Sequence, residues 1–363
     1  MDPGELKFLN ALNAVPGVGA ATLRALRDCF GSFERAWRAD ERAVSAVRMD
    51  DKTRTALAAH KKSADPERMA QKLSQDDIWI ITDDDPLFPP LLREIASPPV
   101  MLYGRGDKTI LAPAYPVAVV GTRRPTPYGV EAAETIAGDL AEAGITIVSG
   151  LAAGIDAKAH AAALARRGVT VAVLGCGTDR QTVFPPENRG LADRIAAGGG
   201  AVISEYAPGT PAVREHFPMR NRIIAGLSRA VIVVEAREKS GALITARMGL
   251  EENRDIMALP GSVFSPASAG PNRLIREGAR AITSGADVLE EFGLDAGRVM
   301  RHHAAQSLNP EETIILSSLD EPLAIDAIRA KTGIPTGALM ASLSLLELKG
   351  LVRGIGGDTF QKA

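Results

Sequence analysis

The chain has 363 residues, of which 45% are hydrophobic and 24% charged, and this is the composition of an ordinary globular protein. A chain longer than about 300 residues is expected to form two or three domains rather than one core. The net charge of −2 at pH 7 lacks the basic excess of most nucleic-acid-binding proteins, so any such binding must come from a local cluster of cations.

The sequence gives no support to a membrane, secreted or metal-binding protein. The longest apolar runs, such as residues 78–81, fall far short of the roughly 20 residues that a membrane-spanning helix needs. The first residues lack the basic start and apolar stretch of a secretory signal. Cys29 and Cys176 fall in different predicted domains, and the five histidines show no zinc-ligand spacing. We therefore expect a cytoplasmic protein without a metal site.

Residues 1–70 predict a small helical domain, because apolar and charged residues alternate there at helical spacing. Residues 12–19 contain a Pro-Gly-x-Gly turn ahead of a helix that ends near Gly31. A turn of this kind between short helices resembles a helix-hairpin-helix, or SAM-like, unit, which can offer backbone N–H groups to a phosphate. The alternative is an ordinary helical turn in which glycine supplies only its positive φ.

The central part of the chain predicts an α/β domain over residues 71–290. Its N-terminal extension, residues 71–115, is rich in Pro and Asp and contains one expected strand at 78–82 and an extended segment at 98–104. From residue 116, short apolar strands alternate with Ala-rich helices, which is typical of a doubly wound, Rossmann-like parallel sheet. The expected strands lie at 117–120, 145–149, 169–174, 201–204, 230–235 and 255–259.

The C-terminal part predicts a linker at residues 291–307 and a winged helix at 308–363. A helix is expected to start at Asn309 and Pro310, two further helices follow, and residues 350–360 favour a short hairpin. The predicted winged helix contains five basic and seven acidic residues, a net charge of −2. Because phosphate affinity depends on counterion release by Lys and Arg, we expect this domain to serve protein contacts or modest shape recognition.

Candidate binding residues follow the predicted strands, where ligands of open α/β sheets are held near helix N-termini. Glycines allow tight turns there, helix starts offer free N–H groups, and arginine has a forked donor geometry that fits phosphate. The candidates are Gly121, Thr122 and Arg123, then Ser149 and Gly150, then Phe217, Arg220, Asn221 and Arg222, and finally Lys239, Ser240 and Gly241.

Local charge supports this set. Residues 214–247 contain seven basic and three acidic residues, and seven minus three gives +4 within a chain of net −2. We therefore expect Arg123, Arg220, Arg222 and Lys239 to converge at one rim of the sheet and to hold a phosphate backbone. The alternatives are that each turn is an ordinary structural loop and that Glu235 pairs with an arginine inside the fold.

The motifs of several enzyme classes are missing. No Gly-Lys dipeptide occurs, so there is no Walker A loop, and the first turn lacks the G-x-G-x-x-G pattern of dinucleotide binding. Cys176 fits a small buried side chain better than a nucleophile, and His160 fits a packing or capping role better than a base. Asp156 fits a role in orienting the turn at Gly154 or in capping a helix. We assign no cofactor and no catalytic residue.

Taken together, the turns closely resemble the DprA/Smf family of DNA-processing proteins. The resemblance covers roughly residues 75–290, with looser agreement on both sides. It rests on the order and spacing of the segments at 119–123, 149–156, 175–179, 204–206, 217–228, 235–236, 239–246 and 260–261.

The resemblance implies binding of single-stranded DNA, including DNA that enters during natural transformation, and loading of RecA onto strands coated by SSB. It also implies a homodimer through the Rossmann-like domain. The family's basic DNA pocket falls here on Arg123, Arg220, Arg222 and Lys239, and Phe217 becomes a candidate base-stacking side chain. The chain departs from the family at Ala153, where Arg is frequent, and at residues 184–185, which read Phe-Pro where Tyr-Pro is frequent.

The favoured function is therefore a non-catalytic mediator that binds single-stranded DNA mainly through phosphates, since aromatic residues make up only 4% of the chain. The main alternative is a nucleotide phosphoribohydrolase of the lysine-decarboxylase-like Rossmann class. That class carries a P-G-G-x-G-T loop with a catalytic glutamate, and the stretches at 198–200 and 260–262 do not fit it. A nucleotide sensor is a third possibility.

Overall fold

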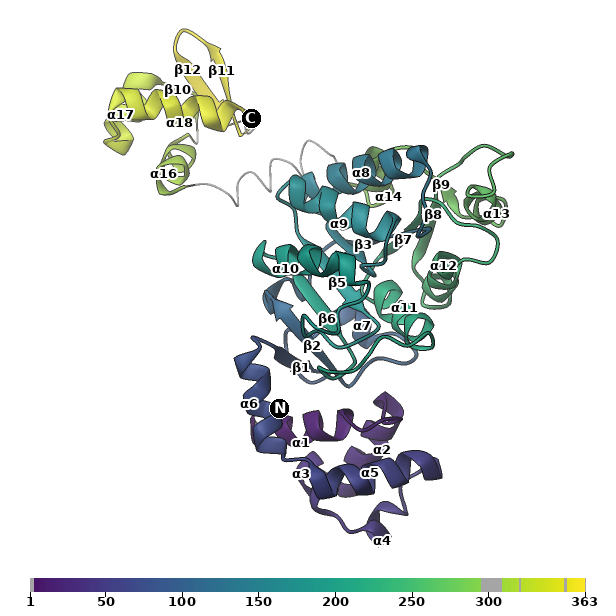
Figure 1. Ribbon diagram of the computed structural model, residues 1–363. Helices are drawn as coiled ribbons and strands as arrows, with labels where there is room; N and C mark the ends of the chain where they lie inside the picture. The colour runs from purple at the N-terminus through teal and green to yellow at the C-terminus, as the bar shows by residue number, and fades with distance from the viewer. Residues whose placement is uncertain (1–2, 295–308, 320, 349–350, 363) are drawn as a thin grey trace. The chain divides into compact units, whose positions relative to one another are not determined.

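The computed structural model describes residues 3–294, 309–319, 321–348 and 351–362. It divides the chain into two compact units, residues 1–285 and 286–363, and we describe each by itself (Figure 1). Most of the predicted linker at 291–307 lies outside the described residues.

The first unit begins with a helical region. Four of its helices start after a side chain that accepts a hydrogen bond from a first-turn N–H group, and these N-caps are Ser32, Asp40, Asp50 and Asp65. Helix α2 ends at Gly31, whose φ of 76° suits glycine. The helices are α1 (Pro3–Asn13), α2 (Ala20–Phe30), α3 (Phe33–Arg38), α4 (Glu41–Val44), α5 (Asp51–Ser63) and α6 (Pro66–Gln75).

The turn between α1 and α2 is packed against α5. Gly17 has a φ of +88°, and a Cβ at this position would lie 2.3 Å from Thr53 Oγ1. Conformation and close packing both require glycine here. They explain this residue without a phosphate, although binding of a phosphate by the turn stays a prediction.

A nine-stranded sheet forms the centre of the first unit, in the order β1-β2-β6-β5-β4-β3-β7-β8-β9. The strands from β6 to β9 in this order are parallel, which confirms the predicted α/β class with a doubly wound sheet. The strands are β1 (Trp79–Thr82), β2 (Met101–Gly106), β3 (Pro116–Val120), β4 (Thr146–Ser149), β5 (Thr170–Leu174), β6 (Ala201–Ser204), β7 (Ala230–Val233), β8 (Asp255–Ala258) and β9 (Arg280–Ala281).

Helices cover both faces of this sheet (Figure 1). Alternate residues of β5 show the two faces, since Val171 and Val173 belong to one apolar core and Ala172 and Leu174 to the other. The helices and short 3-10 helices of this part are α7 (Pro90–Arg93), η1 (Lys108–Leu111), α8 (Pro127–Glu142), α9 (Ile155–Ala165), η2 (Pro186–Asn188), α10 (Arg189–Ala197), α11 (His216–Gly226), α12 (Gly241–Glu251) and α13 (Ala269–Arg276). Helix α14 (Gly285–Glu291) starts at the last residue of the first unit and otherwise belongs to the second.

The chain reverses its direction of winding at β3. Strands β4, β5 and β6 follow β3 on one side, whereas β7, β8 and β9 lie on its other side. The carboxyl ends of β3 and β7 therefore flank the topological switch point, where open α/β sheets bind their ligands.

Residues 71–115 do more than connect two domains. Strand β1 pairs with β2, and β2 pairs with β6, in both cases antiparallel, so the sheet gains two strands that the parallel pattern did not predict. The helical region packs on this edge. Leu9, Leu12 and Leu26 share one apolar core with Met101 and Tyr103 of β2.

The second unit contains a winged helix, as predicted. Helix α16 starts with a capping box, in which Asn309 accepts from the N–H of Glu312 and Glu312 accepts from the N–H of Asn309. The elements are α16 (Pro310–Ser318), β10 (Leu323–Ala324), α17 (Ile325–Thr332), α18 (Thr336–Leu348), β11 (Val352–Gly356) and β12 (Thr359–Lys362). They enclose an apolar core of their own, which includes Ile315, Ile328 and Leu343.

Candidate nucleic-acid interface

The turns that follow β3, β4 and β7 meet at one edge of the sheet. Thr122 donates its N–H to the carbonyl oxygen of Glu235 over 2.7 Å, and Ile155 donates its N–H to the carbonyl oxygen of Thr122 over 3.2 Å. Gly154 has a φ of +85°, and a Cβ there would lie 2.4 Å from the Thr122 carbonyl oxygen. The predicted turns are thus brought together, and glycine is needed where two of them touch.

The N-terminus of α8 at this edge already holds a carboxylate. Glu235 is 1% exposed and accepts hydrogen bonds from the N–H of Thr126 at 2.9 Å and from its hydroxyl group at 2.5 Å. A Cβ at Gly129 would lie 2.2 Å from Glu235 Oε2. The positive end of α8, where a Rossmann fold places a ligand phosphate, is therefore occupied by a side chain of the protein itself.

Arg220 does not face the solvent as the sequence led us to expect. It is 4% exposed, and its Nη1 donates to the carbonyl oxygens of Gly150, at 2.8 Å, and of Val173. Burial lowers the pKa of its guanidinium to about 10, against the opposing effect of Asp156. Arg220 of α11 thus ties this helix to the ends of β4 and β5.

Arg222 is also engaged within the fold. Its Nη2 lies 2.8 and 2.7 Å from the two carboxylate oxygens of Glu205, and the two side chains are only 17% and 12% exposed. The expectation of four free cations at one rim is wrong in this respect, since Arg220 is buried and Arg222 is paired. The sequence offers an internal ion pair of an arginine only as an alternative that involves Glu235. It does not identify Glu205 as the partner of Arg222.

Four further candidates make contacts inside the protein and stabilise the turns of the site, and they do not contribute side chains to its surface. Ser149 is fully buried and donates to the carbonyl oxygen of Val119 at 2.6 Å, and Gly150 is buried against Arg220. Asn221 is 8% exposed and donates to the carbonyl oxygen of Gly241 at 3.3 Å, which links α11 to α12. Gly121 packs on Ile155, since a Cβ there would lie 2.5 Å from Ile155 Cγ1.

Arg123 and Lys239 remain as exposed cations of the predicted set. Neither belongs to a salt bridge among the described residues. Thr122 and Phe217 are partly exposed beside Arg123, whose guanidinium carbon lies 5.4 Å from the centre of the Phe217 ring. Arg124 in the turn of Arg123, Arg237 in the turn of Lys239 and Arg214 ahead of α11 are exposed as well, and they are not in the predicted set.

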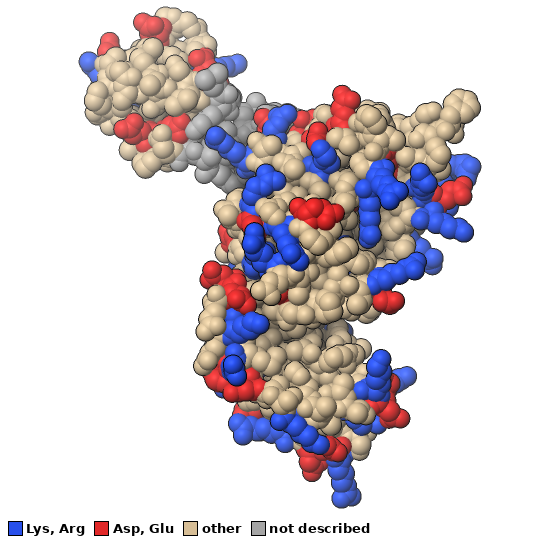
Figure 2. Space-filling view, in the orientation of Figure 1, with Lys and Arg blue, Asp and Glu red and all other residues tan. Residues whose placement is uncertain are grey.

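Lys239 stands at the start of α12. Ser240 caps this helix by accepting from the N–H of Ala242 at 3.3 Å, and Gly241 has open space in the direction of its absent Cβ. A groove of about 600 Å³ extends from this turn along α12 to Arg273 of α13. Basic side chains predominate over acidic ones where α12 and α13 lie (Figure 2).

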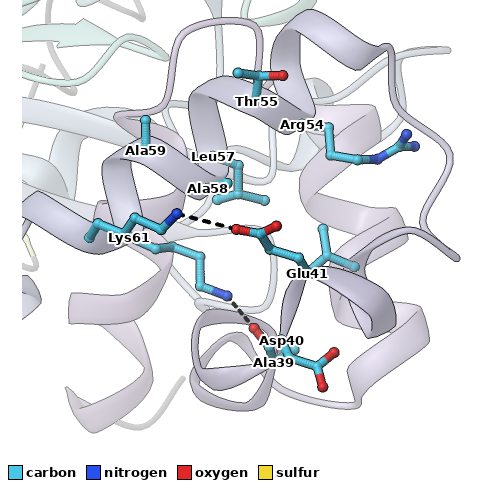
Figure 3. Close-up of a pocket in the computed structure, with 11 residues that line it drawn as sticks. Ala39, Asp40, Glu41, Arg54, Thr55, Leu57, Ala58, Ala59 and Lys61 are labelled. Carbon is cyan, nitrogen blue, oxygen red and sulfur yellow. Dashed lines mark hydrogen bonds and ion pairs between the residues drawn. The ribbon is translucent and has the colours of Figure 1, made fainter.

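A larger groove, of about 800 Å³, lies in the helical region, between α4 and α5. Figure 3 shows that its lysines point to oxygen atoms of the protein. Lys61 Nζ donates to the carbonyl oxygen of Ala39 at 2.5 Å, and Lys62 lies 3.4 Å from Glu41. These cations are engaged, so the exposed cations at the strand ends form the better candidate interface for phosphates.

The three residues considered for catalysis are buried. The Cys176 side chain is fully buried, and burial raises the pKa of its thiol, which disfavours the reactive thiolate. His160 is buried with its Nδ1 2.6 Å from Thr170 Oγ1, in agreement with a packing role. Asp156 accepts from the N–H of Gly150 at 3.1 Å and so orients the turn after β4.

Two broader features of the described residues bear on function. No group of three or more His, Cys, Asp or Glu side chains among them is arranged to hold a metal ion. None of the helices in the same part of the chain is both long and apolar enough to cross a membrane.

Comparison with known proteins assigns the chain to a family. The family model of DNA recombination-mediator protein A matches residues 79–293, and that of the DprA winged helix domain matches residues 299–358. Protein Smf of Synechocystis sp. is 38% identical over 400 residues and is covered completely, as is this chain. Protein Smf of Escherichia coli is 35% identical over 333 residues, which are 88% of each chain.

Solved structures agree with this assignment. DNA processing protein A of Streptococcus pneumoniae superposes with a TM-score of 0.64 at 36% identity, over 78% of this chain and 97% of that one. DNA processing protein A of Helicobacter pylori, solved for its single-stranded DNA binding mode, gives a TM-score of 0.54 at 31% identity, over 60% of this chain and 97% of that one. With matches along the whole sequence, in the sheet and in the winged helix, the chain belongs to the DprA/Smf family of DNA recombination-mediator proteins.

Proposed function

We propose that this protein binds single-stranded DNA at the carboxyl edge of its sheet and performs no covalent chemistry on it. The observation that carries the proposal is that Arg123 and Lys239 are exposed, form no salt bridge within the part of the chain that the structure describes, and stand on turns that meet at one edge of the sheet. The H. pylori relative, which binds single-stranded DNA, supports the same ligand for this chain.

The neighbourhood of the two cations favours a sugar-phosphate strand over a mononucleotide. The α8 N-terminus at the switch point holds Glu235, so a ligand phosphate there would meet a carboxylate. Arg123 and Lys239 are instead exposed on the turns after β3 and β7, and a groove continues from Lys239 along α12. This arrangement supports DNA binding over the alternative of a nucleotide phosphoribohydrolase.

Fluorescence anisotropy with single- and double-stranded oligonucleotides tests the proposal. Arg123→Ala and Lys239→Ala are expected to weaken binding to all single-stranded sequences and to lower the slope of log K against log salt by about 0.7 each. Lys62→Ala, which removes a cation of the helical region, is the matched control and leaves the slope unchanged. Equal slopes in all four proteins would contradict the proposal.

We further propose that the protein delivers the bound strand to RecA on DNA coated by SSB, in the cytoplasm and as a homodimer. These roles rest on membership of the family. Delivery of the strand to RecA is measured as RecA-dependent ATP hydrolysis on SSB-coated single strands, with and without this protein. Light scattering over a concentration series tests for the homodimer, and a molecular mass of one chain at all concentrations would contradict it.

A further inference from the structure

An aromatic ring that the candidate set omitted faces the solvent beside the proposed DNA site. Phe184 is 41% exposed and lies in the loop between β5 and η2. An exposed apolar side chain is common on protein surfaces, so exposure alone assigns it no role. Its neighbours and the way its loop is held are more informative.

Phe184 belongs to a row of three side chains from three segments of the chain. Its ring centre lies 5.9 Å from that of Phe217 at the start of α11, and the two planes are inclined by 53°. On Phe217, the guanidinium of Arg123, from the turn after β3, lies 5.4 Å from the ring centre. An exposed ring, a partly exposed ring and an exposed cation thus follow one another on the surface.

The loop holds the Phe184 ring outward at a fixed place. The residues on either side, Val183 and Pro185, are both buried. Asp179 anchors the loop by accepting from Thr182 Oγ1 at 2.7 Å and from the N–H of Gly209 at 2.6 Å. The ring is therefore presented by an ordered backbone, and its exposure does not result from a loop that lacks anchors.

Phe217 cannot withdraw to cover Phe184 more fully. A Cβ at Gly175 would lie 3.2 Å from Phe217 Cδ1, so the ring already rests directly on the backbone after β5. Each ring is a flat, rigid apolar group close to a cation, and this matches the two parts of a nucleotide, since a base stacks on a ring and a phosphate binds a guanidinium.

We propose that Phe184 is a nucleobase contact, forming with Phe217 a two-ring platform beside the phosphate held by Arg123. This inference rests on the proposed binding of single-stranded DNA and adds a contact to bases where the cations contact only phosphates. Because any base has a flat face, the platform accepts all sequences and gives little sequence preference.

Binding of a 20-nucleotide oligo-dT and of the same strand made entirely of abasic sites tests the platform. Phe184→Ala is expected to weaken binding to oligo-dT about tenfold, as loss of one base-stacking contact does. It leaves the salt slope and the binding of the abasic strand unchanged, because neither depends on bases. Phe184→Tyr keeps a ring and restores affinity.

The control is Phe264→Ala, which removes a ring that is 93% exposed on the loop after β8, and it leaves both affinities unchanged. Wild-type affinity of Phe184→Ala for oligo-dT, or an equal loss on the abasic strand, overturns the platform while leaving the proposed function intact. Failure of the wild-type protein to bind oligo-dT overturns both. Circular dichroism confirms that each variant is folded.

Discussion

Arg220 and Asp156 hold the same residue from opposite sides of its backbone. The guanidinium of Arg220 donates to the carbonyl oxygen of Gly150 at 2.8 Å, and the carboxylate of Asp156 accepts from the N–H of Gly150 at 3.1 Å. Both side chains are almost fully buried, and the turn after β4 is fixed between them. This gives Arg220 a structural role at a position where the sequence suggested contact with DNA.

Arg220→Met is therefore expected to lower the free energy of unfolding by about 3 kcal/mol or more, because Asp156 and two carbonyl groups lose their buried partner. Urea denaturation followed by circular dichroism measures this change. A variant as stable as the wild type that has lost only its DNA affinity would instead show that Arg220 acts directly on the ligand.

Glu205 and Arg222 are expected to be coupled in stability. The contact of Arg222 Nη2 with both Glu205 oxygens is largely shielded from water, so a double-mutant cycle of Glu205→Gln and Arg222→Met should give an interaction free energy on the order of 1 kcal/mol. Urea unfolding of the wild type, both single variants and the double variant provides the four values. Additive effects would show that the pair contributes nothing beyond its separate side chains.

His160 is expected to make the protein sensitive to mild acid. Burial and the nearby charge of Arg220 lower its pKa to about 3, so the imidazole stays neutral in the folded chain. In the unfolded chain it takes up a proton below about pH 6.5, and stability is therefore lost as the pH falls from 6.5 towards 3. Between pH 7 and pH 5 the loss amounts to about 2 kcal/mol.

His160→Gln should remove this part of the pH dependence, as measured by urea unfolding at both pH values. The pKa values of His60 and His216 are lowered as well, mainly by burial, and add slopes of the same sign. The pKa of Asp156 is raised by burial and adds a slope of opposite sign. Only the difference between variant and wild type isolates His160, and identical pH profiles would refute the assignment.

Gly129→Ala is expected to destabilise the protein by about 2 kcal/mol, because the added methyl group would press on the carboxylate of Glu235 at the start of α8. Gly190→Ala is the matched control, since Gly190 lies in α10 with nothing within 4 Å of the added atom. That change should be neutral or slightly stabilising. Thermal unfolding compares the two, and an equal effect would argue against steric pressure on Glu235.

Removal of residues 308–363 is expected to leave the affinity for single-stranded DNA within a few-fold. The predicted winged helix carries five basic and seven acidic residues, so it releases few counterions on contact with a strand. Anisotropy measurements on the shortened and full chains test this. A hundredfold loss of affinity would assign the domain a direct role in binding.

Periodicity was sufficient to predict the parallel sheet and the winged helix, because buried strands and helical stretches have distinct local patterns. Local patterns contain no information on pairing between distant segments, and so they did not predict that β2 pairs with β6. The same limit applies to the site. Arg123 and Arg220 look alike in sequence, yet one is exposed and the other is enclosed by Gly150, Val173 and Asp156, which are distant in the chain.

Phe184 is an exposed residue whose role beside the candidate site could not be predicted from the sequence. In sequence it is only a mild departure from a Tyr-Pro pair, with no pattern that marks it as exposed. Its position beside Phe217 depends on a loop after β5 and a helix that starts over 30 residues later. Such a contact becomes visible only when the two segments are placed in space.

The apolar core that α1 and α2 share with β2 bears on how the protein can be dissected. A fragment that began at residue 71 would leave Val100, Met101 and Tyr103 without much of the apolar core that covers them. Such a fragment should be poorly soluble, and brief proteolysis of the intact chain should not release it. The first 70 residues are thus an integral part of the apolar core beside β2 and not an independent domain.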